Sequence, residues 1–393
     1  MWFAYFLNYC DRQAAFSMFP SLKAGLSMSD KQLGFVGAAF LWVYAFGCPV
    51  AGQLGDRFSK RVLVVLSLAL WSVVTIATGF STGAAMLLTL RAVMGISESL
   101  YMPTAIALTA NAHPPELRSR AVAVLTTAQI AGTVAGSWFG GWMADRGLWR
   151  GAFFVLGAAG VLYALPYFLF LRTVNERPDP ETVNTRAAFA ISALVKVPTF
   201  LLLCVVFPVF VFGLWLLYGW LPTFLHDKFL LNQSDAAFNA TVFLQGATLI
   251  GLLGGGVLAD AFYRRTKAAR LWLMVASLVL CAPCLHALGS SDGLNSTRMA
   301  AAGFGLFSGL LMGNIFPAAF EVVPADTRAS AVGVLNFCGA IMSGFATLFG
   351  GLWKKSLGID HLLTLTAIAY VAAGVALFAG IQVLFQRDYE KTH

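Results

Sequence analysis

The sequence predicts an all-α membrane protein in which twelve transmembrane helices form two pseudo-symmetric six-helix bundles. Three observations support this fold: the composition is apolar, the apolar residues fall into twelve runs, and the two halves of the chain repeat one another. Of the 393 residues, 59% are hydrophobic and only 11% are charged, whereas soluble domains carry about 25% charged residues. The composition therefore excludes a soluble globule.

Each apolar run is long enough to cross a bilayer core about 30 Å thick. The first run contains Asp11 and Arg12 and has no small-residue cleavage site, so we expect a spanning helix and not a signal peptide. A stretch at 172–197, rich in charge and proline, divides the chain into an N-terminal bundle (1–171) and a C-terminal bundle (198–393). The twelve runs fall near 2–22, 31–54, 61–80, 84–111, 119–143, 150–171, 198–225, 236–262, 269–289, 298–322, 329–353 and 361–386.

The basic residues predict how the chain is oriented. Loops on the side of the linker and of both termini carry about twice as many Lys and Arg residues as the opposite loops, which is the positive-inside pattern. We therefore expect the linker and both termini in the cytoplasm, and a bacterial inner (plasma) membrane. The net charge of +8 reflects this bias and does not indicate nucleic-acid binding.

The internal repeat predicts how the two halves are related. Residues 52–61, reading GQLGDRFSKR, recur as GVLADAFYRR at 256–265, and RSRAVAVL at 118–125 recurs as RASAVGVL at 328–335. Repeats of this kind predict two parallel bundles related by an axis along the membrane normal, with a binding site between them near the midplane.

Two full charges, Arg91 and Glu98, lie well inside the apolar run 84–111. They are seven residues apart, so on a helix they share one face and are separated by about 10 Å. A charge near the bilayer centre costs about 2.5–3.5 kcal/mol. We therefore expect this face to meet a partner or a water-filled path. The alternative, a snorkelling arginine with a glutamate at a helix end, fits less well because both residues are far from the ends of the run.

Asp11 and Arg12 add one charge of each sign to the first run. Adjacent helical residues point about 100° apart, so the two side chains need separate partners, and Arg91 and Glu98 can supply them. One interpretation is a static brace in which the four charges neutralise each other. The other is proton coupling, because low dielectric favours a neutral carboxyl group unless it is paired. The chain has no Walker-type phosphate loop, so energy for transport must come from a gradient.

The repeated loops at 52–61 and 256–265 place an aspartate at a helix end, followed by two cations. Such a group can hold one conformation and release it in another, although it can also be plain stop-transfer charge. This pattern resembles the signature of the major facilitator superfamily. The resemblance implies a gating set of Gly52, Asp56, Arg57, Arg61, Asp260 and Arg264. Separately, the position of Glu321 near the end of the run 298–322, just before Pro324, indicates a structural cap or a gate partner.

A narrower resemblance is to the anion:cation symporter branch of that superfamily, which takes up sugar acids and other organic anions with protons and includes the vesicular glutamate transporters and sialin. It implies that Asp11 and Glu98 carry protons, that Arg91 tunes Glu98, and that Arg12 binds the substrate carboxylate. Further substrate contacts by this resemblance are Tyr44, Gln129, Trp215, Gln245 and Asn336. The motifs that carry it are Asn8-Tyr-Cys-Asp11-Arg12, Gly95-x-x-Glu98 with Pro103, Pro114-Pro-Glu-x-Arg118-x-Arg-Ala121 and Trp220-Leu-Pro-Thr-Phe-Leu225.

The sequence thus predicts a proton-coupled symporter of a small organic anion that works by rocker-switch alternating access. The main rival is a spinster-type transporter of lysophospholipids or sphingolipids, which Tyr101 and the Phe-rich composition would suit. A non-transporting receptor and an intramembrane enzyme are less favoured, since the gate loops are intact and the helices carry no nucleophile–base pair or metal cluster. We expect no cofactor and a monomer.

Overall fold

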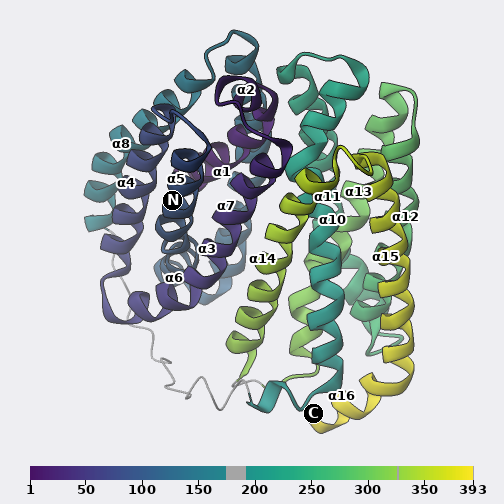
Figure 1. The fold of residues 1–393 in the computed structure, drawn as a ribbon. Helices are drawn as coiled ribbons and strands as arrows, with labels where there is room; N and C mark the ends of the chain where they lie inside the picture. Colours follow the sequence, from purple (N-terminus) through teal and green to yellow (C-terminus); the bar gives the residue numbers. More distant parts are fainter. Residues whose placement is uncertain (174–191, 325–326, 393) are drawn as a thin grey trace. The chain divides into compact units, whose positions relative to one another are not determined.

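The computed structural model describes residues 1–173, 192–324 and 327–392, and within them all regular structure is helical. Most of the predicted linker at 172–197 lies outside the described residues. The first part of the chain forms α1 (Trp2–Ser17), α2 (Phe19–Gly25), α3 (Asp30–Arg57), α4 (Lys60–Gly79), α5 (Ala84–Ser99), α6 (Tyr101–Ala112), α7 (Pro115–Asp145) and α8 (Trp149–Thr173). The second part forms α10 (Pro198–Phe229), α11 (Gln233–Tyr263), α12 (Ala269–Ser290), α13 (Leu294–Phe320), α14 (Arg328–Trp353) and α15 (Ile359–Gly380), followed by a π-helical turn (Ile381–Phe385) and α16 (Gln386–Thr392) (Figure 1).

Nine helices in the described part of the chain are long and apolar enough to span a membrane. The other three predicted spans correspond to α1 with α2, to α5 with α6, and to α7. Both split spans break beside a proline. Pro20 lies in the first turn of α2, and Pro103 follows the break at Leu100. Proline has no N–H to donate to the carbonyl four residues earlier, which weakens the helix at that point.

The described residues group into two compact units. Unit 1 comprises 1–173 together with Leu217–Thr241 and Thr347–Leu352, and unit 2 comprises 192–216, 242–346 and 353–392. Three unbroken helices, α10, α11 and α14, therefore contribute residues to both units. The predicted boundary between two six-helix halves stays a prediction.

Within unit 1, α1 lies along α7 and α4 lies along α8. The second contact depends on Gly157 of α8, because a Cβ added there would lie 2.6 Å from the Ser72 carbonyl oxygen and 2.6 Å from Ile76 Cγ1. The aromatic core of this unit contains Trp71 and Tyr101, whose rings meet edge to face with centroids 5.0 Å apart. This core holds α4 against α6.

One end of unit 1, which we call the α2 end, gathers α2, the start of α3, the last turn of α7, the start of α11 and the last turns of α14. The Asp145 carboxylate at the end of α7 accepts hydrogen bonds from the backbone N–H groups of Gln233 (2.7 Å) and Ser234 (2.9 Å), the first residues of α11. At the start of α3, a Cβ added to Gly34 would lie 2.8 Å from the Thr347 carbonyl oxygen of α14. The helix ends are therefore in backbone-to-backbone contact.

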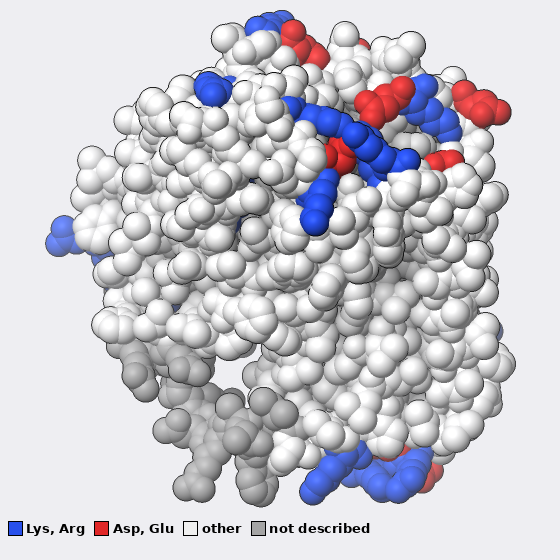
Figure 2. All heavy atoms as spheres, in the orientation of Figure 1, with Lys and Arg blue, Asp and Glu red and all other residues white. Residues whose placement is uncertain are grey.

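Within unit 2, α12 packs against both α13 and α15. On this unit, Figure 2 shows Lys and Arg side chains gathered at the end where α16 lies, next to a broad surface without charged side chains. This distribution suits a protein whose helix ends meet water and whose middle meets lipid.

Candidate functional site

The centre of the candidate site is an ion pair buried in unit 1. Arg12, in the middle of α1, donates from Nη2 to Oε2 of Glu98, in the last turn of α5, at 2.7 Å. The two side chains are 5% and 0% exposed, so neither is directed at lipid. Removing one partner of a buried pair costs about 3–5 kcal/mol, because the other charge is left uncompensated. Any event that neutralises Glu98 therefore gives Arg12 a strong tendency to find another anion.

Three aromatic rings surround the Arg12 guanidinium. Its Cζ lies 4.8 Å from the ring centroid of Tyr9, 4.6 Å from that of Phe40 and 5.4 Å from that of Tyr44. Phe40 and Tyr44 are one turn apart on α3, with ring centroids 6.0 Å apart, so α3 presents both to α1. Each cation–π contact contributes about 0.5–2 kcal/mol. The cage helps to hold the guanidinium in place, and the Arg12 Nε makes no hydrogen bond within the described residues.

The other two intramembrane charges are also buried, at 1% exposure for Asp11 and 2% for Arg91. Among the described residues, Asp11 forms no ion pair with a cation at hydrogen-bond distance. Its Oδ2 accepts a hydrogen bond from the Thr75 hydroxyl of α4, at 3.3 Å. Arg91 donates to the Met94 thioether at 3.4 Å, and its charge acts on both Glu98 and Asp11. Arg12 and Glu98 thus form an ion pair, whereas the Asp11 carboxylate accepts a hydrogen bond from the Thr75 hydroxyl.

Gln129 of α7 is linked to the pair through two tyrosines. The Tyr5 hydroxyl donates to Oε1 of Gln129 at 3.0 Å, and the rings of Tyr5 and Tyr9 meet edge to face at 5.2 Å. Since Tyr9 is also part of the cage around Arg12, the structure connects Gln129, the cage and Glu98 by direct contacts within unit 1.

The remaining predicted substrate contacts belong to unit 2. Trp215 lies on α10 and is half-buried, Gln245 lies on α11 and is buried, and Asn336 lies on α14 and is exposed. The Nε2 of Gln245 makes no hydrogen bond within the described residues. The structure thus brings Glu98 and Tyr44 each to Arg12, while the three unit 2 residues belong to other helices.

The predicted gate residues can be followed in the second repeat. Asp260 is exposed near the end of α11, and its Oδ1 pairs at 3.1 Å with Nη2 of Arg270 on α12. Arg270 also donates from Nε to Oε1 of Glu321, at 2.9 Å, just beyond α13. Arg264 lies exposed after the end of α11. Burial raises the pKa of the Glu321 carboxyl to about 7, against the opposing charge of Arg270.

In the first repeat, Gly52 lies in α3 and Arg61 lies half-buried in the first turn of α4. The side chains of Asp56 and Arg57, at the end of α3, lie outside the described part of the structure. The contacts of the gate aspartate can therefore be described only in the second repeat, at Asp260.

Sequence reasoning missed three groups that contribute to the site. Phe40 completes the cage, Thr75 holds Asp11, and Arg270 binds both Asp260 of the second repeated loop and Glu321 at the end of α13. A signal existed for Phe40, which precedes Tyr44 by one helical turn. None existed for Thr75, because a hydroxyl in a spanning helix usually bonds to its own backbone.

Comparison with known proteins identifies relatives over most of the chain. Residues 1–347 match the sequence profile of the Major Facilitator Superfamily. A probable sulfoacetate transporter of Cupriavidus necator is 30% identical over 325 residues, covering 76% of this chain and 74% of that protein. The hexuronate transporter of Bacillus subtilis is 23% identical, covering 96% of this chain and 91% of that protein.

A solved structure shares the fold. A bacterial homologue of the human lysosomal transporter spinster, in an inward-facing and occupied conformation, superposes with a TM-score of 0.84 at 21% identity, covering 98% of this chain and 96% of that one. At this identity the likeness concerns the fold alone. It confirms the fold class predicted from the apolar runs and the repeat.

Proposed function

Because this chain belongs to the major facilitator superfamily, we propose that it is a proton-coupled symporter of a small organic anion such as a sugar acid or monocarboxylate. The observation that carries the proposal is the buried Arg12–Glu98 pair inside its aromatic cage. The relatives support the substrate class, since one is described as a sulfoacetate transporter and another as a hexuronate transporter. Sulfoacetate and hexuronates are both organic anions.

The proposed coupling uses the two partners that Arg12 can have. With Glu98 ionised, the guanidinium is neutralised by the carboxylate at 2.7 Å. When Glu98 takes up a proton, the cage still holds Arg12 while its charge lacks a partner. An incoming carboxylate can then accept from two N–H groups of the guanidinium at once. Proton and anion therefore bind together, and Arg12 is never left alone in a low dielectric.

Asp11 is proposed as a second proton carrier, with Thr75 as its hydrogen-bond donor. Arg91 would then balance whichever carboxylate is ionised, because its charge acts on both. A proton moving across the membrane supplies about 2.3 kcal/mol per 100 mV. One proton with one monoanion carries no net charge, so that stoichiometry draws only on the pH gradient. Two protons per monoanion, one on Glu98 and one on Asp11, move one net charge, and the potential then suffices to concentrate the anion more than tenfold.

Alternating access is proposed to use the contacts at the α2 end. The Asp145 cap on α11 and the backbone contact of Gly34 with Thr347 support a state closed at that end. The positive-inside bias favours assigning the α2 end to the outer face of a bacterial inner membrane. Tyr44, Gln129, Trp215, Gln245 and Asn336 are proposed to complete the substrate contacts, with the Asp56 and Asp260 loops as the gate.

The test is transport by purified protein in proteoliposomes with an inward proton gradient, using sulfoacetate, hexuronates and aldarates as substrates. Glu98→Gln keeps the shape of the side chain but cannot release a proton. We expect it to abolish proton-driven accumulation and to retain exchange of labelled for unlabelled substrate, which needs no net proton movement. A variant with normal proton-driven uptake and no exchange would show that the assignment of Glu98 is wrong.

The role of Arg12 in binding the anion is tested by Arg12→Lys, which keeps the positive charge but loses the planar guanidinium group. Loss of a charge-assisted hydrogen bond costs about 1.5–3 kcal/mol, so we expect KM for the anion to rise by about 10–100-fold. Arg146→Lys, at an exposed position after α7, is the matched control. Uptake of lysophospholipid in place of all the anions would favour the spinster-type alternative.

A further inference from the structure

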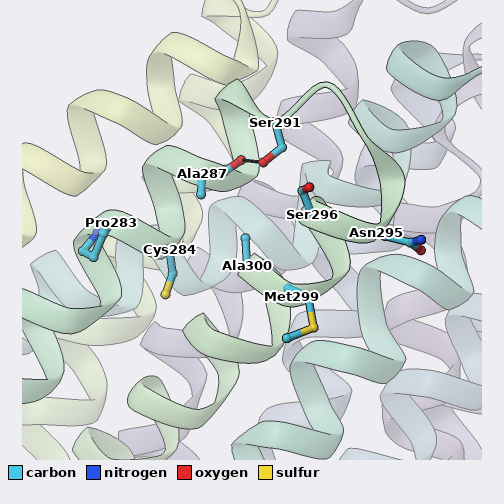
Figure 3. A pocket seen from close by; sticks show the side chains of 8 residues that line it. All are labelled: Pro283, Cys284, Ala287, Ser291, Asn295, Ser296, Met299 and Ala300. Carbon is cyan, nitrogen blue, oxygen red and sulfur yellow. Dashed lines mark hydrogen bonds between the residues drawn. The ribbon is translucent and has the colours of Figure 1, made fainter.

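Unit 2 contains a cavity that none of the proposed transport residues line. It lies between the last turns of α12 and the first turns of α13 and has a volume of about 560 Å³, within the range of small-molecule sites. Figure 3 shows its lining side chains projecting from the two helices around the connecting loop. Those residues are Pro283, Cys284, Ala287, Ser291, Asn295, Ser296, Met299 and Ala300.

The lining changes character along the cavity. Hydroxyl and amide groups, from Ser291, Asn295 and Ser296, lie next to the loop, whereas Pro283, Cys284 and Met299 lie deeper along the helices (Figure 3). Pro283 lies on α12 and Ser291 directly follows its last residue, so the two are eight positions apart, which corresponds to about 12 Å along a helix. One leaflet of the hydrocarbon core is about 15 Å thick. The cavity therefore runs from a polar rim to an apolar floor over nearly the depth of a leaflet.

Two charged residues of opposite sign, Arg298 and Asp292, are close in the chain to the rim residues, although neither lines the cavity. Arg298 donates from Nη1 to the Asn295 carboxamide oxygen at 2.8 Å, and its guanidinium lies over the ring of Phe243 on α11, 5.6 Å from the centroid. These contacts hold the cation beside the rim, since Asn295 itself lines the cavity. Asp292, in the loop between α12 and α13, is exposed. A planar guanidinium suits a phosphate diester, and a carboxylate suits an ammonium group.

We propose that this cavity binds a membrane phospholipid, with one acyl chain between α12 and α13 and the headgroup phosphate at Arg298. A zwitterionic headgroup such as phosphoethanolamine suits these two charges, with its phosphate at Arg298 and its ammonium group toward the loop that carries Asp292. The floor is open to the bilayer, since Met299 is 74% exposed. A lipid can thus enter sideways from the leaflet. The site is separate from the Arg12–Glu98 pair, which belongs to unit 1.

The test uses phosphatidylethanolamine carrying a photoactivatable diazirine in its acyl chain, doped into phosphatidylcholine vesicles that contain the full-length protein. We expect crosslinks to concentrate on peptides covering residues 283–300. Ala287→Phe, which fills the cavity, should lower them several-fold. Ala376→Phe, on the exposed face of α15, is the matched control and should leave them unchanged. Equal labelling of α12, α13 and α15, or crosslinks that persist unchanged in Ala287→Phe, would overturn the proposal.

A second measurement needs no variant. Cys284 lines the cavity, whereas the half-buried thiols Cys204 and Cys338 do not. Adding phosphatidylethanolamine to the detergent-purified protein should slow the alkylation of Cys284 by a small maleimide and leave the other two rates unchanged. Arg298→Gln should reduce this protection. Protection by inorganic phosphate alone would show a free-anion site, and protection that follows protein concentration would show a contact between two copies; either result would contradict the lipid assignment.

Discussion

Removing the carboxylate of Asp145 should open the α2 end of unit 1 more often. Its two oxygens accept from the N–H groups of Gln233 and Ser234 at 2.7 and 2.9 Å, which makes Asp145 an N-terminal cap supplied by a different helix. Loss of a cap costs about 0.5–2 kcal/mol, and a carboxylate at a helix N-terminus adds about 0.3–1 kcal/mol. Because Asp145 is exposed, we expect Asp145→Ala to destabilise the closed state by about 1 kcal/mol. This corresponds to about a fivefold shift of the equilibrium toward the open state.

The assay is the alkylation rate of a cysteine placed at Thr347, which is buried at the α2 end, in detergent-purified protein whose six native cysteines have been replaced. The rate reports the open fraction when opening is fast compared with labelling. We expect Asp145→Ala to raise it about fivefold. Asp292→Ala removes an exposed carboxylate from another loop and is the control. An unchanged rate in Asp145→Ala, or an equal rise in the control, would refute the capping argument.

Two further predictions concern stability. The raised pKa of Glu321, about 7 against 4.5 unperturbed, means that its neutral form favours the folded state. The stabilisation of the folded state by this carboxyl group is complete below pH 4.5 and is lost as the pH rises through about 7. We therefore expect Tm to fall less steeply between these pH values in Glu321→Gln than in the unmodified protein. A variant whose Tm follows the same pH profile would contradict this. Gly157→Leu should lower the free energy of unfolding by about 1–3 kcal/mol through overpacking, because its Cβ would lie 2.6 Å from Ser72 O, whereas Ala158→Leu on the exposed face should change Tm little in thermal denaturation.

Apolar runs predict helices in this chain because a spanning segment must satisfy its own backbone. The run at 269–289 corresponds to α12 at 269–290, and the run at 198–225 to the start of α10. The ends of the helices were less predictable, because a helix can continue beyond its apolar run into polar residues. Thus α3 begins with a capping box formed by Ser29 and Gln32, one residue before the run. The break at Leu100 was missed, although Pro103 marks it, because apolar residues continue across it.

The sequence placed Arg12 and Glu98 inside spanning helices and required separate partners for Asp11 and Arg12. It could not choose among those partners, since helix spacing gives the direction of a side chain but not which neighbouring helix it meets. The structure pairs Arg12 with Glu98 and leaves Asp11 to Thr75. Likewise the loop pattern indicated Asp260 but not Arg270, because their contact depends on how α11 and α12 meet.

The three helices that both units share have a mechanical consequence. Because α10, α11 and α14 run unbroken across the unit boundaries at 216–217, 241–242 and 346–347, any rearrangement of the units must bend these helices or repack their sides, and no loop can act as the hinge there. Near one junction, Gly350 of α14 packs directly against the indole of Trp220 on α10, and a Cβ added there would clash with the ring. A movement of one unit against the other must therefore be accommodated within the backbone of α10, α11 and α14 themselves.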